Sequence, residues 1–390
     1  MKSEHFCYMP WHGLAVAANG DIKPCCQWRD NLGKVDNVNI VEAYKNNPKI
    51  VNLRKDFLQG HKPESCKSCW EREEQIGESR RKWFTSNFIK SIPDDFQYSE
   101  TIDDPIYTQA DINLSNVCNL KCRMCGAWAS HSWFEEEISL GKISKDFQKE
   151  SDVTKLKIRQ HELSNLESLI PYFKNMNRID FKGGEPMMAK NHIEFLELLI
   201  KQKLNENIVL QYTTNGTIVN PKILKTLSSF KKIRLMFSIE GTDNLYSYIR
   251  GGAYSVNQLE DTIALYNNLP NAEIGFNVTV QAYNLLNLHH LYNLLSIWNK
   301  KYKSVSNKNA FTTICNSPLY LSPFVLPKNL RLLARKNLEN ITDFNVLVTN
   351  LDSNEIHDQH WETFKKFTTH LDLFRNENIF QVIPEMKEVW

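Results

Sequence analysis

The sequence lacks any long hydrophobic run. No stretch approaches the ~18–20 consecutive apolar residues that a membrane-spanning helix needs. The first ten residues include Lys2, Glu4 and His5, and they contain no apolar segment of the kind that a secretory signal peptide requires. Glycine and proline are sparse, with 14 of each among 390 residues, which excludes a collagen-like or linker-rich chain. We therefore expect a cytoplasmic protein with no membrane attachment.

An excess of charge of one sign is also absent. Lys and Arg total 47 and Asp and Glu total 45, so the formal net charge is +2. This balance gives no strong field for nucleic acid or acidic lipid, and we do not expect nucleic acid as a partner. Hydrophobic residues make up 42% of a chain that is longer than a typical domain of ~100–200 residues. The composition predicts a globular protein with more than one module.

Cysteine is the residue with an unusual distribution. Eight of the nine cysteines fall in the first third of the chain, in groups separated by only a few residues. A reducing cytosol makes disulfides an improbable explanation, and cysteines that only pack in a core would be scattered. Metal ligation is the simplest interpretation. The nine cysteines are Cys7, Cys25, Cys26, Cys66, Cys69, Cys118, Cys122, Cys125 and Cys315.

The sharpest group has the spacing C-x3-C-x2-C and comprises Cys118, Cys122 and Cys125. It follows the alternating segment Ala110–Leu114, which predicts a short strand. Three thiolates in one loop can hold three irons of a [4Fe–4S] cube and leave the fourth iron open. Structural zinc normally takes four protein ligands, and no fourth Cys or His lies close by in sequence. The spacing therefore favours an iron–sulfur cluster over zinc.

This loop resembles the cluster-binding loop of the radical S-adenosylmethionine (radical SAM) superfamily. A second motif supports the resemblance: the strand-like segment Arg178–Lys182 leads directly into Gly183, Gly184, Glu185 and Pro186. In that superfamily a GGEP loop after the second strand holds the amino group of SAM. The resemblance implies a [4Fe–4S] cluster and S-adenosyl-L-methionine as cofactors.

The remaining chain alternates between predicted strands and helices. Such a β/α rhythm predicts a parallel sheet with right-handed crossovers, and six units match the partial (β/α)6 TIM-like barrel of the resembled superfamily. We expect an α/β protein with an N-terminal Cys-rich, twitch/SPASM-like domain at 1–100, the barrel at 105–325, and a helical C-terminal extension at 326–390. Further expected strands are Ile208–Thr213, Ile233–Ser238, Glu273–Val280 and Phe311–Ile314, and expected helices are His192–Lys203, Pro221–Ser228, Val256–Asn267 and Asn287–Trp298.

The resemblance also implies roles for single residues at the carboxyl ends of these strands. Ser238 and Arg250 are expected near the ribose or carboxylate of SAM, and Asn215 is a weaker candidate in the same region. Met124 precedes the third cysteine of the loop, where the superfamily places an apolar residue beside the adenine. An ordinary capping or turn role is the alternative for each of the polar residues.

A second site is predicted at the amino terminus. Cys7 and Cys25 flank Asn19-Gly20-Asp21, a turn expected between Leu14–Ala18 and Ile22–Lys23, and a helical segment through Arg54–Leu58 leads on to the pair Cys66 and Cys69. Four thiolates make a closed site for zinc or a [4Fe–4S] cluster. The pattern resembles the twitch and SPASM domains, which implies an auxiliary [4Fe–4S] cluster, although the better-known members carry this domain after the barrel. The role of Cys26 stays open.

The resemblance implies an enzyme that cleaves SAM reductively to a 5′-deoxyadenosyl radical, which abstracts a hydrogen atom from a substrate. A flavodoxin- or ferredoxin-like protein is the expected electron donor. The expected substrate is a peptide or protein, modified by oxidation or epimerisation, and Cys315 is a candidate hydrogen-atom donor or else a packing residue. The alternatives are a dehydrogenase of a small alcohol such as an aminocyclitol, a tRNA-modifying enzyme, and a zinc-stabilised scaffold protein.

Overall fold

The computed structural model describes residues 3–35, 39–143, 163, 166–351 and 358–390. The chain divides into two compact units. The first comprises Met1–Ser115, His161–Tyr212 and Lys225–Ile233, and the second comprises Asn116–Gln160, Thr213–Leu224 and Arg234–Trp390. No helix in the described ranges is both long enough and apolar enough to cross a bilayer.

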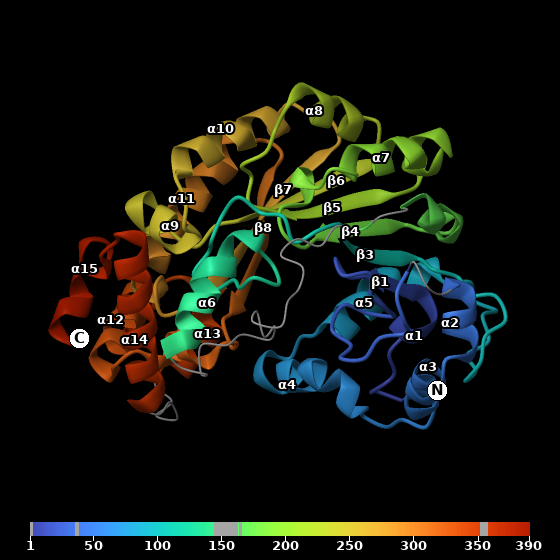
Figure 1. Cartoon of the computed structure of the whole chain (residues 1–390), viewed down its shortest axis with the longest axis horizontal. Helices are drawn as coiled ribbons and strands as arrows, with labels where there is room; N and C mark the ends of the chain where they lie inside the picture. Colours follow the sequence, from blue (N-terminus) through green and yellow to red (C-terminus); the bar gives the residue numbers. More distant parts are fainter. Residues whose placement is uncertain (1–2, 36–38, 144–162, 164–165, 352–357) are drawn as a thin grey trace. The chain divides into compact units, whose positions relative to one another are not determined.

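In the described part of the chain there are eight strands, and from β3 onward helices lie between them in the sequence (Figure 1). The strands are β1 Gly13–Val16, β2 Ile22–Lys23, β3 Gln109–Asn113, β4 Arg178–Lys182, β5 Val209–Thr214, β6 Lys232–Ser238, β7 Ala272–Val280 and β8 Val305–Ile314. The helices are α1 Met9–His12, α2 Ile40–Asn46, α3 Pro48–Leu58, α4 Lys67–Ile76, α5 Arg80–Phe88, α6 Phe134–Ile143, α7 His192–Lys201, α8 Pro221–Ser228, α9 Asp243–Arg250, α10 Val256–Asn267, α11 Leu288–Lys301, α12 Lys328–Leu338, α13 Asn345–Asn350, α14 Asp358–Arg375 and α15 Ile379–Val382.

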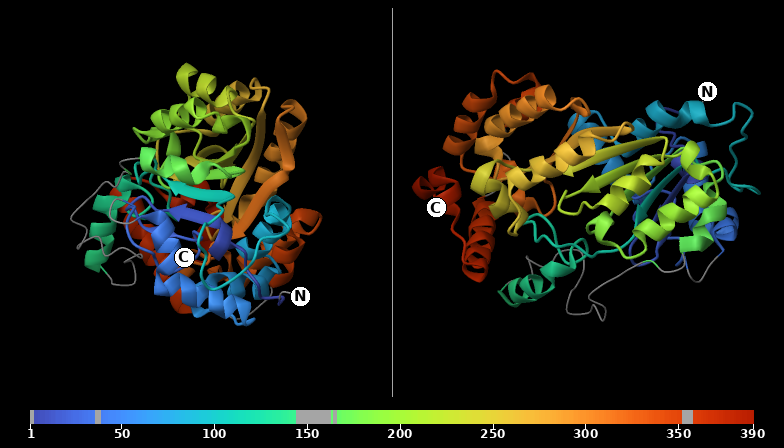
Figure 2. Two further views of the ribbon diagram at one scale, coloured as in Figure 1. Left: turned by 90° about the vertical axis from the view of Figure 1, so that its right-hand side faces the viewer. Right: turned by 90° about the horizontal axis from the view of Figure 1, so that it is seen from above.

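The sheet of the first unit begins with an antiparallel hairpin and continues with parallel strands. β1 pairs with β2 on one side and, in parallel, with β3 on the other. β3, β4 and β5 then pair in parallel, in the order in which they occur in the chain. Figure 2 shows β1 and β3 side by side. The amino-terminal hairpin therefore extends the parallel sheet, so that two strands precede the first of the six that were expected.

The second unit contains the end of β5, most of β6, and the long strands β7 and β8. β7 and β8 pair in parallel, from Ile274 opposite Val305 to Val280 opposite Ile314. The register is irregular between Ile274 and Phe276. Their order in the sheet again follows the chain. The expected α/β class with a parallel sheet and β/α repeats is confirmed.

Most of the expected elements are present with small shifts at their ends. β4 is found with the expected bounds, β6 and β7 each begin one residue before the predicted start, and β5 is displaced by one residue at both ends. β8 begins at Val305, six residues before its expected start. The hairpin at Asn19–Asp21 is confirmed, with Gly20 at φ +85°, a conformation that favours glycine.

Two buried polar side chains fix the hairpin. The Tyr44 hydroxyl lies 2.8 Å from the carbonyl oxygen of Gly13 and 2.7 Å from that of Lys23, and so it bridges β1 and β2. Arg54 of α3 is fully buried and donates hydrogen bonds to the carbonyl oxygens of Pro10 and Tyr44. These bonds set the position of the segment that carries Cys25.

Candidate functional site: two groups of cysteines

The three-cysteine loop, Cys118–Cys125, lies in the second unit, directly after the end of the segment that carries β3. Cys118 and Cys122 are buried and Cys125 is half-buried. Leu120 is buried with them, and Met124 and Tyr254 pack against the group. The three thiols therefore stand in an apolar surrounding with one of them still open to solvent. This differs from the all-round burial expected of cysteines that only fill a core.

Side chains that follow the loop satisfy its backbone carbonyl groups. Trp133 donates its indole N–H to the carbonyl of Cys122 at 2.8 Å, and Ser132 donates its hydroxyl to that of Cys118 at 2.7 Å. The amide of Cys118 in turn donates to Nδ1 of His131 at 3.2 Å. Because these bonds use backbone groups, they fix the loop without involving its thiols.

Charged side chains of both signs act on Cys122. A hydrogen bond with Cys125 lowers the pKa of Cys122, burial raises it, and the Arg250 guanidinium lowers it again. The same thiol–thiol hydrogen bond, together with burial, raises the pKa of Cys125 well above its usual value. Burial alone would lower the pKa of Arg250, but the negative charges of Cys122 and Glu240 hold it well above its usual range. This environment suits a thiolate ligand.

The Gly183–Pro186 loop lies in the first unit and follows β4. Gly183 has φ +112°, and a Cβ at this position would lie 2.6 Å from the carbonyl oxygen of Ser115. The amide of Gly184 donates to that same oxygen at 2.8 Å. Only glycine fits this contact, which joins the GGEP loop to the residue that immediately precedes Asn116 and the three-cysteine loop. Glu185 is buried and accepts a hydrogen bond from the amide of Met187.

The other predicted site residues have the following surroundings. The Asn215 amide points its Nδ2 at Sγ of Cys118, at 3.6 Å, and donates to Oδ1 of Asn119 at 3.1 Å. Arg250 donates to Oε2 of Glu240 at 3.1 Å, and both side chains are buried. Ser238 is half-buried at the end of β6. Cys315 is buried directly after β8, with its amide bonded to the carbonyl of Val280 at the end of β7.

Asn215 and Arg250 are therefore brought to the three-cysteine loop within the second unit. The geometry links Asn215 with Cys118, and the charge of Arg250 acts on Cys122 and Cys125. For Arg250 the observed partner is Glu240, an interaction that sequence reasoning did not foresee.

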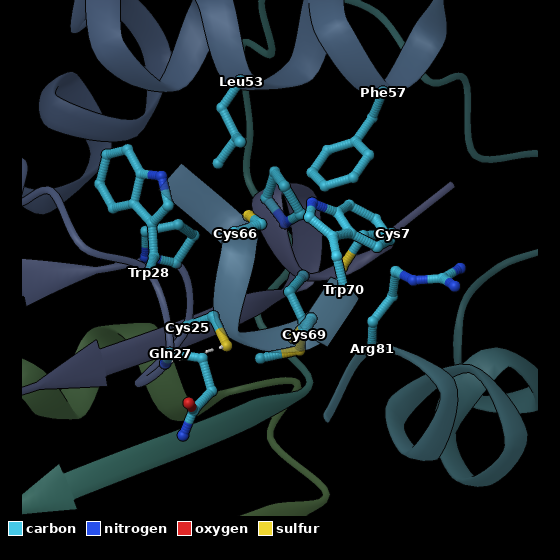
Figure 3. Close-up of a pocket in the computed structure, with 13 residues that line it drawn as sticks. Cys7, Cys25, Gln27, Trp28, Leu53, Phe57, Cys66, Cys69, Trp70 and Arg81 are labelled. Carbon is cyan, nitrogen blue, oxygen red and sulfur yellow. Dashed lines mark hydrogen bonds between the residues drawn. The ribbon is translucent and has the colours of Figure 1, made fainter. Parts of the chain in front are cut away.

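The four amino-terminal cysteines of the predicted second site line one hollow in the first unit, and their sulfur atoms come from different elements (Figure 3). Cys7 precedes α1, Cys25 follows β2, and Cys66 and Cys69 lie at the start of α4. The rest of the lining is mostly apolar, with Trp28, Leu53, Phe57 and Trp70 among its residues, and it also includes Gln27 and Arg81. The tertiary structure thus gathers residues that are 62 positions apart in the sequence, from 7 to 69.

The chemistry of this set fits a positively charged iron–sulfur group. Burial, as the largest cause, and the neighbouring thiols raise the pKa of Cys7, and burial and Cys69 raise that of Cys66 to about 12. Thiols that oppose one another's ionisation in an apolar hollow are stabilised as thiolates only when a cationic group binds among them. Within the described ranges, no three His, Cys, Asp or Glu side chains are grouped as ligands of a single metal ion.

A charged network next to Cys26 was not foreseen from the sequence. Arg80 of α5 contacts Asp111 of β3 at 3.1 Å and Asp180 of β4 at 3.2 Å, and Lys182 contacts Asp111 at 2.9 Å. Burial alone would raise the pKa of Asp111. The positive charges of Arg80 and Lys182, together with a hydrogen bond from Cys26, instead hold this pKa far below its usual range. Asp111 and Asp180 are register partners, so the alternation of polar and apolar residues in β3 and β4 was the available signal.

Comparison with known proteins identifies both parts of the chain. The radical SAM superfamily matches residues 112–283, and the iron–sulfur cluster-binding domain named SPASM matches residues 7–70. The radical SAM cyclopropyl synthase TigE of Paramaledivibacter caminithermalis is 27% identical over 171 residues, which cover 42% of this chain and 33% of that protein. The chain therefore spans about a third of the length of this curated relative.

Two solved structures show a limited similarity to the chain. The structure of anSMEcpe with bound AdoMet is 20% identical, has a TM-score of 0.42, and is matched over 62% of each chain. The structure of Streptococcus suis SuiB bound to the precursor peptide SuiA is 12% identical, with a TM-score of 0.37, over 99% of this chain and 75% of that one. Both cysteine groups lie inside the matched ranges: residues 112–283 form a radical SAM superfamily region, and residues 7–70 form an amino-terminal iron–sulfur cluster-binding domain of the SPASM family.

Proposed function

We propose that this chain is an enzyme that cleaves S-adenosylmethionine reductively and uses the resulting radical to modify a substrate. The observation that carries the proposal is the three-cysteine loop, whose thiols lie together while its backbone is satisfied elsewhere. Cys118, Cys122 and Cys125 would hold a [4Fe–4S] cluster through three irons. When bound, this cluster and SAM supply a 5′-deoxyadenosyl radical that abstracts a hydrogen atom from an unactivated C–H bond.

As the similarity to the radical SAM superfamily implies, the GGEP loop and Asn215 would bind and orient SAM. Gly183 has no Cβ, which allows its backbone to lie close to the Ser115 carbonyl oxygen. The buried carboxylate of Glu185 suits the SAM amino group. Asn215, beside Cys118, is a donor for the SAM carboxylate or ribose. The Arg250 guanidinium is paired with Glu240. Its positive charge also acts on Cys122, so Arg250 would complement the charge of the cluster thiolates.

The amino-terminal hollow would hold an auxiliary [4Fe–4S] cluster on Cys7, Cys25, Cys66 and Cys69. Its wall of tryptophan, phenylalanine and leucine side chains excludes water, and a low dielectric is one of the factors that set the potential of such a group. An auxiliary cluster supports an oxidative reaction, because it can accept an electron from a substrate radical. A flavodoxin- or ferredoxin-like protein would supply the electron that starts the reaction.

We propose a peptide or protein as the substrate, and a small alcohol as the competing class. The open question between oxidation and epimerisation concerns Cys315, whose buried thiol follows β8. In an epimerase, Cys315→Ala would abolish the product while SAM cleavage continues. In an oxidase, the same variant would keep both activities.

The activity is tested with the anaerobically reconstituted full-length chain, SAM and dithionite. The expected product is 5′-deoxyadenosine, and Cys122→Ala is expected to abolish it. The control is Cys26→Ala, which removes a half-buried thiol outside the loop and is expected to retain SAM cleavage. No 5′-deoxyadenosine from the wild type, together with a stoichiometric zinc content, would favour the scaffold alternative and contradict the proposal. Turnover of a peptide encoded by a neighbouring gene, rather than of an aminocyclitol, would decide the substrate class.

A further inference from the structure

The carboxyl-terminal extension contacts the three-cysteine loop inside the second unit. The residues involved are Arg123 within the loop, and Asp372, Arg375 and Glu377 at the end of α14 and just beyond it. Nothing in the composition of the extension indicates chemistry of its own. Its contacts with the loop nevertheless involve fully buried charges, which are costly unless their geometry is well defined.

Arg123 ties the loop to the extension. Its side chain is fully buried, and its Nη2 lies 2.5 Å both from Asp372 Oδ1 and from Glu377 Oε2. Its guanidinium carbon lies 3.6 Å from the centre of the Tyr248 ring, and the Tyr248 hydroxyl donates to the same Asp372 oxygen at 2.8 Å. Arg123 and Asp372 are 249 positions apart in the sequence.

The end of α14 is shaped for this contact. Asn376 adopts a left-handed conformation with φ +54°, and the amide of Glu377 donates back to the carbonyl of Asp372 at 2.9 Å. This is a Schellman-type helix ending, which reverses the chain. The reversal brings the Glu377 carboxylate to Arg123, which Asp372 already contacts from the last turn of the helix.

Arg375 makes a second and independent tie. It donates to the carbonyl oxygen of Lys121 at 2.7 Å and to Glu136 Oε2 at 2.5 Å. Glu136 also accepts from the Lys121 ammonium group at 2.6 Å, so both charged partners converge on residue 121 of the loop. Only 4% of the Arg375 side chain is exposed.

We propose that the carboxyl-terminal extension is a clamp on the three-cysteine loop, with Arg123 and Arg375 as positioning residues for the cluster. Helix α9 completes the clamp from the other side, because the amides of Lys121 and Arg123 donate to the carbonyls of Gly251 and Ile249. The loop is thus held at positions 121 and 123, on either side of Cys122, by contacts that do not use its thiols. The role in positioning a cluster rests on the proposed function, whereas the effect on the loop itself can be tested without it.

The test is hydrogen exchange in the metal-free, full-length protein, which needs neither cluster nor SAM. Arg375→Met is expected to accelerate exchange of the amides of residues 119–125 at least tenfold, while β7 and α10 keep the protection of the wild type. Lys366→Met is the control, since it removes an exposed positive charge from the same helix. Unchanged exchange in the loop, or equal acceleration in β7 and α10, would overturn the clamp.

A second readout separates position from charge in the reconstituted protein. Arg375→Lys keeps the charge but loses the planar fork that reaches Lys121 and Glu136 together. We expect both variants to accelerate loop exchange, but only Arg375→Met to make the midpoint potential of the cluster in the three-cysteine loop more negative, because a nearby positive charge is lost. Identical midpoint potentials in the wild type, Arg375→Lys and Arg375→Met would contradict the expectation that Arg375 places a positive charge near this cluster. If the wild type produced no 5′-deoxyadenosine, the exchange result would still stand, so the two proposals fail separately.

Discussion

At the residue scale, Gly183 allows the sharpest test of the GGEP loop. A Cβ there would meet the Ser115 carbonyl oxygen at 2.6 Å, at a φ that side chains avoid. We expect Gly183→Ala to lower the free energy of unfolding by ~2–3 kcal/mol and to abolish SAM binding. Gly77→Ala is the control, because its φ is +74° but no atom lies within 4 Å of the new methyl group. Urea unfolding and equilibrium dialysis of the reconstituted protein measure the two effects, and equal losses in both variants would contradict the prediction.

His192 provides a pH-dependent test at the same scale. It is buried, its Nε2 lies 2.8 Å from the Tyr212 hydroxyl, and burial lowers its pKa to about 4. Between about pH 4 and 6.5, His192 is therefore protonated in the unfolded chain, where its pKa is near the usual 6.5, but stays neutral in the folded chain. Stability is then lost as the pH falls from about 6.5 towards 4, by roughly 3 kcal/mol in total.

The contribution of His192 is isolated by comparing the wild type with His192→Gln, since other titrating groups cancel in the difference between them. The variant is expected to be less stable at pH 7, but its deficit should shrink by about 3 kcal/mol by pH 4. Parallel stability curves for the two proteins would show that the imidazole is not held neutral.

At the scale of elements, Tyr44 joins α2 to both strands of the amino-terminal hairpin. Tyr44→Phe removes the one hydroxyl donor that the carbonyl groups of Gly13 and Lys23 share, so we expect a loss of ~1–3 kcal/mol in unfolding free energy. Because the hairpin carries Cys25, iron bound at the amino-terminal site should also fall, while iron at the three-cysteine loop persists. Tyr292→Phe is the control, since no hydrogen bond of its hydroxyl is found among the described residues. A normal iron content in Tyr44→Phe would show that the Tyr44 hydrogen bonds are not needed for iron binding at the amino-terminal site.

The elements also show what sequence can predict. β3, β4 and β5 were predictable because their alternation between apolar and polar residues matches a pleated strand. Helix α5 was not foreseen, because its sequence RRKWFTSNF does not sort apolar residues onto one face, and its register depends on Arg80 reaching Asp111 and Asp180. The cysteines could be grouped from spacing alone. The partners of Arg123 could not, because no local pattern indicates which distant carboxylates meet a buried arginine.

At the scale of the whole molecule, the two cysteine groups belong to different compact units and should bind iron independently. The reconstituted chain is expected to hold about eight irons, as two [4Fe–4S] clusters require. Replacing Cys118, Cys122 and Cys125 with Ala should leave about four irons and no SAM-dependent change in the electron paramagnetic resonance spectrum of the reduced protein. Replacing Cys7, Cys25, Cys66 and Cys69 should also leave about four, with that change retained.

Cys315→Ala is the control for this experiment, since Cys315 follows β8 and belongs to neither group. It should keep the full iron content, because a single buried thiol outside both sets adds no ligand. Loss of all iron when either group is replaced would mean that the sites fold together rather than separately. Zinc in place of iron at the amino-terminal site alone would retain the proposed cleavage of SAM but remove the electron acceptor on which an oxidative outcome depends, leaving epimerisation through Cys315 as the reaction to test.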